Sequence, residues 1–412
     1  MLTAIFSVPS LLLAIFTLMA GSSFLATLVS LRLDAGGSHA LMIGIVGTGY
    51  FAGLTVGARR VTALIGRVGH IRTFAAVASL LSATALAFPI VPPGLGWAAL
   101  RFLNGIAMAG VFICLESWLN ERAEASTRGS VLAGYMIALY SGQALGQILL
   151  TLDMADQAMP FAMAAMLVSL AAIPVALTRI ASPEIFDATP LKVVELYHVS
   201  PLGCIGTIVT GLMFGSFYAL GAVYVLRQGG SVDDAAWFMT AVILGGVALQ
   251  FPLGRLSDRF DRRKVIIALF GGTILSSLAL ALAGLSGAAS LALGMAFGGL
   301  GFALYPLCVA HTNDHLKPEQ RVGASGGLVL IYSLGAAVGP FVAGGAMETF
   351  GPSGLFLFLA GCAAITFGFG LWREWRTDSI PEALQQDFQV LPRTTPVAAS
   401  LDPYAEEGEA DA

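Results

Sequence analysis

Three polar side chains stand in one apolar stretch of the chain, between residues 95 and 118. Arg101 and Asn104 lie about one helical turn apart near its start, and Glu116 lies near its end. A charge at the centre of a bilayer costs about 3 kcal/mol, so it normally faces a cavity or a partner. These residues therefore mark either a polar pathway or a structural anchor paired with a neighbouring polar group.

The composition places this stretch in a membrane protein. The chain has 412 residues, of which 57% are hydrophobic and 11% are charged, whereas soluble domains are about 25% charged. Continuous apolar runs of about 20 residues favour helices over a barrel. We count twelve spans, near residues 8–31, 41–58, 71–90, 95–118, 130–152, 159–179, 201–226, 234–254, 265–284, 288–311, 324–345 and 354–372. The predicted fold class is an all-α polytopic membrane protein with twelve transmembrane helices.

The basic residues predict the orientation. Of the 21 Lys and Arg residues, 18 fall on one side of the membrane if the chain crosses it at each span, Arg32 and Arg227 fall on the other, and Arg101 lies within a span. Cytoplasmic loops carry the excess of basic residues, so we expect both termini to be cytoplasmic.

An internal repeat divides the chain in two. The segment Leu18–Ser22 matches Leu212–Ser216, and Cys114 matches Cys308, both at a shift of 194 residues. Two six-span halves of parallel topology are one common transporter design. We expect an N-terminal half (1–179), a cytoplasmic linker (180–200), a C-terminal half (201–375) and a disordered acidic cytoplasmic tail (376–412).

Polar side chains are distributed unevenly among the spans. Spans three, six, nine and twelve lack Asn, Gln, Tyr, His and charged residues in their interiors, so we expect them on the outside of the bundle. The remaining spans would line a central cavity. The candidate cavity residues are Arg101, Asn104, Gln143, Gln147, Tyr218, Tyr305 and Tyr332. Lone tyrosines can instead lie in the interfacial belt.

Glu116 is the one carboxylate well within a span, which makes it a candidate for proton coupling. It lies near the cytoplasmic end of its span, so a structural partnership with a loop arginine is an equal alternative.

The loop after the eighth span carries the most specific motif, Gly254-Arg-Leu-Ser-Asp258-Arg259-Phe-Asp-Arg262-Arg263-Lys264. It resembles the G-x-x-x-D-R-x-G-R-R/K signature of the major facilitator superfamily, and this resemblance implies a gating loop formed by Gly254, Asp258, Arg259, Arg262 and Arg263. The corresponding loop of the first half starts at Gly57 but lacks the acidic residue, which puts a symmetric latch in doubt.

Two further segments carry the resemblance. Arg101-x-x-Asn104-Gly105 is similar to a span-four signature of the same superfamily, and Glu116–Glu121 resembles its poorly characterised YcaD-like branch. The resemblance implies a secondary active transporter in a bacterial-type cytoplasmic (inner) membrane, moving a small solute by alternating access. It implies a small-molecule substrate, protons as a candidate coupling ion, the lipid bilayer as surroundings, no nucleic acid, and a functional monomer. It does not identify the substrate.

Other classes of function find less support. The four cysteines all lie in apolar spans, and we expect neither a disulfide framework nor a metal site. His311 and His315 have helical metal-site spacing but lack an obvious third ligand, and no nucleotide-binding G-x-x-x-x-G-K-[ST] motif occurs. We expect no cofactor and no enzymatic activity. A membrane-embedded enzyme would need a cluster of nucleophiles, whereas a non-transporting sensor or scaffold on the same fold remains the alternative.

Overall fold

The computed structural model describes residues 2–123, 127–154, 156–177, 183, 191–284, 287–376 and 385–401. Within these ranges the chain is helical. The long helices are α1 (Leu2–Ala35), α2 (Ala40–Val68), α3 (His70–Ala87), α4 (Leu95–Arg122), α5 (Arg128–Ile148), α6 (Met159–Leu177), α8 (Pro201–Arg227), α9 (Val232–Ser257), α10 (Arg262–Leu282), α11 (Gly287–Asn313), α12 (Pro318–Phe350) and α13 (Gly354–Glu374). The short elements are α7 (Val193–Val199), η1 (Leu149–Thr151) and η3 (Pro396–Leu401).

The long helices correspond to the twelve predicted spans. Eleven of them are long and apolar enough to cross a membrane, and α5 falls short because Tyr135, Tyr140, Gln143 and Gln147 reduce its hydropathy. Several helices extend beyond the apolar spans. The helix α2 continues beyond its apolar span, through Arg59 and Arg60, to Val68. A helix satisfies its backbone hydrogen bonds internally, so it can extend out of the apolar layer into a stretch with polar side chains.

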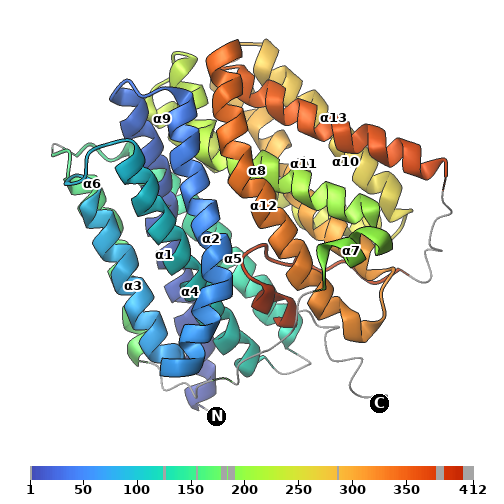
Figure 1. The fold of residues 1–412 in the computed structure, drawn as a ribbon, viewed down its shortest axis with the longest axis horizontal. Coiled ribbons are helices and arrows are strands. Elements are labelled where there is room, and N and C mark those ends of the chain that lie inside the picture. Colours follow the sequence, from blue (N-terminus) through green and yellow to red (C-terminus); the bar gives the residue numbers. More distant parts are fainter. Residues whose placement is uncertain are drawn as a thin grey trace.

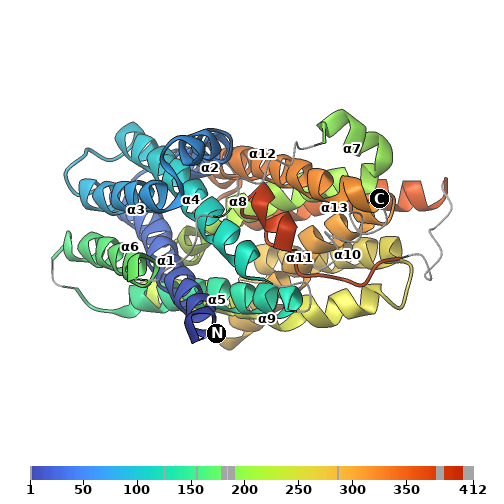
Figure 2. The ribbon, with the colours of Figure 1, turned by 90° about the horizontal axis from the view of Figure 1, so that it is seen from below.

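The two halves repeat each other in space. The helix α2 begins at residue 40 and α9 at residue 232, and α4 and α11 begin at residues 95 and 287. Both pairs are offset by 192 residues, close to the predicted 194. Helices α3 and α6 stand at one extreme of the molecule, and α10 and α13 stand at the other (Figures 1 and 2). These are spans three, six, nine and twelve, which confirms their predicted place outside the bundle.

Close helix packing within each half depends on small residues. A Cβ atom on Gly142 or Gly146 of α5 would overlap the carbonyl oxygens of Phe16 and Ala20 in α1. Gly335 and Gly339 of α12 meet α8 in the same way. Such residues allow helix backbones to approach closely in a membrane, where packing drives association. Close approach of helices thus occurs at matching places in both halves.

The chain after α13 differs from the prediction. We expected disorder from residue 376 onward, but residues 385–401 pack between the two halves, with η3 near α4 and α12 (Figure 2). Phe388, Leu391 and Leu401 are buried there. The expectation of disorder is wrong for this segment, because these apolar side chains find a ready-made surface between the halves. The linker residues 178–182 and 184–190 and the acidic residues 402–412 lie outside the described part of the chain.

Candidate functional site

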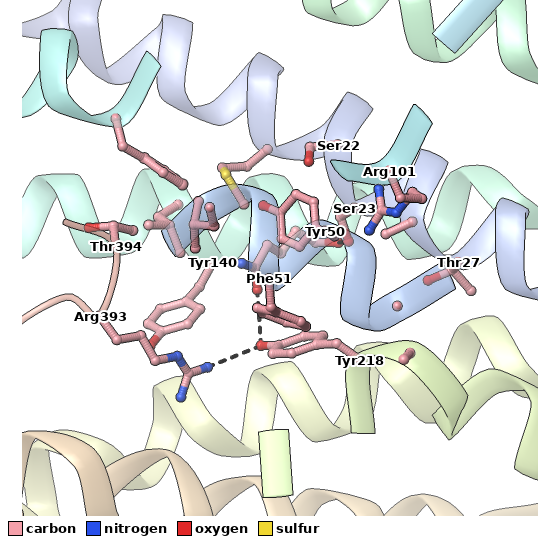
Figure 3. A pocket seen from close by; sticks show the side chains of 18 of the residues that line it. Ser22, Ser23, Thr27, Tyr50, Phe51, Arg101, Tyr140, Tyr218, Arg393 and Thr394 are labelled. Atoms are coloured by element: carbon pink, nitrogen blue, oxygen red, sulfur yellow. Dashed lines mark hydrogen bonds between the residues drawn. The ribbon is translucent and has the colours of Figure 1, made fainter. Parts of the chain in front are cut away.

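A cavity of about 140 Å³ lies between the two halves of the bundle (Figure 3). Helices α1, α2, α4 and α5 of the first half line it, together with α8 and α12 of the second half and residues 392–394. The prediction of about eight lining helices was thus too generous, because α9 and α11 contribute no residue to the lining. Five of the seven predicted cavity residues line it, namely Arg101, Gln143, Gln147, Tyr218 and Tyr332.

Arg101 lies on one side of this cavity, stacked on an aromatic ring. Its guanidinium carbon is 4.4 Å from the centre of the Tyr50 ring, and the side chain is only 7% exposed. Among the described residues, no carboxylate lies within ion-pair distance of it. A buried cation that is stabilised by a ring face alone keeps hydrogen-bond donors for a ligand.

The two glutamines of α5 have different environments. The Gln147 side-chain oxygen accepts a hydrogen bond from Thr27 (3.0 Å), and its nitrogen donates to Ser23 (2.6 Å), both in α1. Gln147 therefore joins α5 to α1. The Gln143 oxygen accepts a bond from the Tyr218 hydroxyl of α8, at 3.3 Å. Gln143 and Tyr218 thus connect the two halves across the cavity.

Two predicted residues are not in the cavity lining. The Asn104 side-chain nitrogen donates to Thr84 of α3, so its amide points toward an outer helix. Tyr305 packs edge-on against Tyr332, with ring centres 5.3 Å apart, and is buried. Both predictions placed the residue on the correct helix but in the wrong direction around it.

We call residues 385–401 the C-terminal segment. Arg393 of this segment enters the cavity opposite Arg101 (Figure 3). Its guanidinium donates a hydrogen bond of 3.3 Å to the Tyr218 hydroxyl. It also lies over the rings of Phe214, Tyr218, Phe302 and Tyr332. No motif in the sequence predicted this contact.

Glu116 lies beside the cavity and is fully buried. Its carboxylate accepts hydrogen bonds from the Tyr135 hydroxyl (2.7 Å) and from the hydroxyls of Thr394 and Thr395. A loop arginine, which was the alternative to proton coupling, does not pair with Glu116 in the described residues. The C-terminal segment supplies two of the three donors that stabilise this carboxylate.

The predicted gating loop also contacts the C-terminal segment. The Arg262 guanidinium, 1% exposed, donates to Asp258 (2.9 Å), Asp314 (2.5 Å) and the carbonyl of Gln386 (2.6 Å). The backbone amides of Gln386 and Phe388 donate to Asp314 (3.1 Å) and Asp258 (3.0 Å). Burial raises the pKa of the Asp314 carboxyl, and the positive charge of Arg262 opposes the rise.

The other members of this loop play smaller parts. The Phe388 ring packs where a Cβ atom of Gly254 would stand, which explains why only glycine fits there. Arg263 pairs with Asp261 at 3.3 Å, and Arg259 is exposed. The loop thus anchors residues 386–388 as well as connecting α9 to α10.

At the opposite end of the bundle, a group of ionic contacts that the sequence did not reveal joins the two halves. Arg227 of α8 pairs with Asp34 of α1 at 2.8 Å and donates to the carbonyl of Ser38 at 3.1 Å. It also lies 3.9 Å from Glu348 of α12, which accepts a hydrogen bond from the backbone amide of Ala40. We call Asp34, Arg227 and Glu348 the ionic gate.

Comparisons with known proteins agree with this architecture. A family model described as Major Facilitator Superfamily matches residues 203–400. The chain is 28% identical over 359 residues to a protein of Salmonella enteritidis called an uncharacterized MFS-type transporter, YcaD, covering 86% of this chain and 92% of that protein. A relative of the same name from Escherichia coli O7:K1 is 29% identical over 345 residues, covering 83% and 89%. The chain is thus similar to proteins of the major facilitator superfamily.

Solved structures of the major facilitator fold superpose on most of the chain. The nucleoside transporter NupG gives a TM-score of 0.74 at 14% identity, covering 92% of this chain and 100% of that one. A bacterial homolog of the lysosomal transporter Spinster gives 0.70 at 13% identity, covering 90% and 96%. At such identities the likeness concerns the fold. The predicted fold class and the resemblance to the YcaD-like branch of this superfamily are confirmed.

Proposed function

We propose that the protein is a secondary transporter that moves a small solute across the membrane by alternating access. The observation that carries this proposal is the cavity between the two halves, which has polar side chains from both. In a protein of two parallel repeats, a site at their interface can be exposed to each side of the membrane when the halves rock. Arg101, Gln143, Tyr218 and Tyr332 are the residues we propose to contact the solute.

The two ends of the cavity differ, which supports a gated pathway. At one end the ionic gate and the packing of α2 against α12 hold the halves together. At the other end, the described part of the C-terminal segment lies between the halves. We propose that the bundle opens toward the side of this segment and that the ionic gate is the contact that must break for opening toward the other side.

We propose that the segment side is cytoplasmic, within a bacterial-type cytoplasmic membrane. Eighteen basic residues fall on this side of the membrane and two fall on the other, and cytoplasmic loops carry the excess of basic residues. A reporter fused after Arg227 would then lie outside the cytoplasm. A cytoplasmic location of that reporter would contradict the proposed topology.

Proton coupling through Glu116 is the finer part of the proposal. The carboxylate is buried at the edge of the cavity, and its neighbours are hydroxyl groups rather than cations. It can therefore change its protonation without breaking an ion pair. In proteoliposomes, Glu116→Gln should remove the pH dependence of uphill transport while exchange continues. Unchanged pH dependence would exclude coupling at this residue.

The proposed function is tested by flux. Purified protein is screened against metabolites and drugs by thermal shift, because a ligand at 100 times its dissociation constant adds about 2.7 kcal/mol of stability. Each compound that stabilises the protein is then followed into proteoliposomes. We expect saturable flux that Arg101→Ala reduces at least tenfold, whereas Arg376→Ala, outside the cavity, should not. Binding without flux would favour a non-transporting sensor.

A further inference from the structure

The rings around Arg393 form an aromatic cage. The guanidinium carbon lies 4.8 Å from the ring centre of Phe302, 4.9 Å from Phe214, 5.5 Å from Tyr332 and 5.9 Å from Tyr218. The four rings come from α8, α11 and α12, so the second half of the bundle builds the whole cage. A cation within about 6 Å of a ring centre is attracted by the negative face of the ring.

The cage recognises charge without a carboxylate. Within the described residues no acidic side chain lies within ion-pair distance of Arg393, and its guanidinium donates a hydrogen bond to the neutral Tyr218 hydroxyl. The neighbouring carboxylate of Glu116 is bound to Thr394 and Thr395. Ring faces favour weakly hydrated organic cations, such as guanidinium and alkylammonium groups, over compact hydrated ions.

The occupant of the cage comes from a segment that closes the pathway. Residues 392–394 line the same cavity as Arg101. Residues 386–388 are bound to the loop of Asp258 and Arg262, at the end of the bundle opposite the ionic gate. A solute moving between the cavity and that end would meet this segment. The segment must therefore leave during transport, and the cage would then be empty and available.

We infer that Phe214, Tyr218, Phe302 and Tyr332 form a binding site for an organic cation, and that Arg393 of the chain's own C-terminal segment competes for it. The inference rests on the proposed function, since it names the class of solute for the same cavity. It makes the segment an internal inhibitor whose arginine imitates the solute. Arg101, across the cavity, remains free to meet a polar or anionic part of the same molecule.

Binding of a matched pair of probes to the full-length protein tests the inference. N-propylguanidinium copies the end of an arginine side chain, and N-propylurea has nearly the same shape without the charge. We expect Arg393→Ala to bind N-propylguanidinium at least tenfold more tightly than the wild type does, measured by calorimetry, and to bind N-propylurea weakly. The control is Arg376→Ala, which removes an arginine that stacks on Trp372 outside the cavity, 5.0 Å from its ring centre. It should bind as the wild type does.

A second substitution places the site. In the Arg393→Ala background, Phe214→Leu should weaken binding of N-propylguanidinium at least fivefold. The inference is overturned if Arg393→Ala binds no more tightly than the wild type, if N-propylurea binds equally well, or if Phe214→Leu has no effect.

A measurement on a chain that keeps Arg393 covers the case in which Arg393→Ala does not fold. A spin label at Gln389→Cys reports on the segment, and the four native cysteines are buried. N-propylguanidinium should increase the mobility of this label, whereas N-propylurea should not; equal spectra with both probes would overturn the inference. Binding at the cage without any flux would refute the proposed transport alone. Flux of a solute that N-propylguanidinium does not inhibit would refute the cage alone.

Discussion

At the residue scale, a few polar side chains connect the cavity with the C-terminal segment. Asp258 and Arg262 belong to the loop that resembles a family signature, yet their hydrogen bonds reach Gln386 and Phe388. Glu116 reaches Thr394 and Thr395. The residues that suggested gating and coupling in the sequence are therefore the same ones that hold the segment in place.

Weakening one of these contacts should release the segment. Asp258→Asn keeps the size of the side chain but removes the charge that accepts bonds from Arg262 and from the Phe388 amide. Hydrogen bonds to charged groups contribute about 1.5–3 kcal/mol, so we expect hydrogen exchange of residues 385–401 to become at least tenfold faster. Arg259→Gln, at an exposed position of the same loop, is the control. Equal exchange in both variants would show that the loop does not anchor the segment.

The cavity residues show how far sequence reasoning reaches at this scale. Placing Arg101 in a cavity needed only the cost of a buried charge. Asn104 is one turn further along α4, and its amide points instead to Thr84 of α3, a contact that no pattern in the sequence indicates. Tyr305 was assigned to the right helix, but it packs edge-on against Tyr332, which lines the cavity, and does not line the cavity itself. The direction in which a side chain points from its helix depends on neighbouring residues that are distant in the sequence.

At the scale of elements, we propose that the close contact between α2 and α12 keeps one end of the bundle closed. A Cβ atom on Gly44 would overlap the carbonyl oxygen of Pro340, and one on Gly344 would overlap that of Ala40. Thr48 of α2 adds a hydrogen bond of 2.7 Å to the carbonyl of Ala337. These contacts join opposite halves, so they must separate when the ionic gate opens.

Overpacking the contact between α2 and α12 should favour the state in which the ionic gate is open. Gly44→Ala forces α2 and α12 apart, and overpacking typically costs about 1–3 kcal/mol in the packed arrangement. We expect a cysteine at Thr48 to react faster with a water-soluble maleimide in the Gly44→Ala background. The matched control is Gly361→Ala in α13, where an added methyl group meets nothing within 4 Å. Equal reaction rates in the two backgrounds would show that this contact does not hold the end closed.

The long helices could be predicted from the sequence, whereas the packed C-terminal segment could not. Long apolar spans and a repeat of half the chain specify the helices, and the lack of polar residues identifies the outer ones. The C-terminal segment was missed because its acidic end dominates its composition. Phe388, Leu391 and Arg393 are too few to predict packing, and the surface that they contact is assembled from several distant helices.

At the scale of the whole molecule, we propose that the two halves turn about their shared cavity. One end is held by the ionic gate and by α2 against α12, and the other is occupied by residues 385–401. Each set of contacts joins the halves at one end only. The breaking of one set and the closing of the other should therefore be coupled, since a rigid half that tilts moves both of its ends.

Distances between spin labels at the two ends test this central claim most directly. One pair, Gly36→Cys with Thr349→Cys, spans the end with the ionic gate, and a second pair, Gly66→Cys with Arg259→Cys, spans the other end; both are measured in lipid nanodiscs with and without Gly44→Ala. We predict a reciprocal change, in which Gly44→Ala lengthens the first distance and shortens the second. Two distances that stay fixed, or that change in the same sense, would contradict alternating access in this protein.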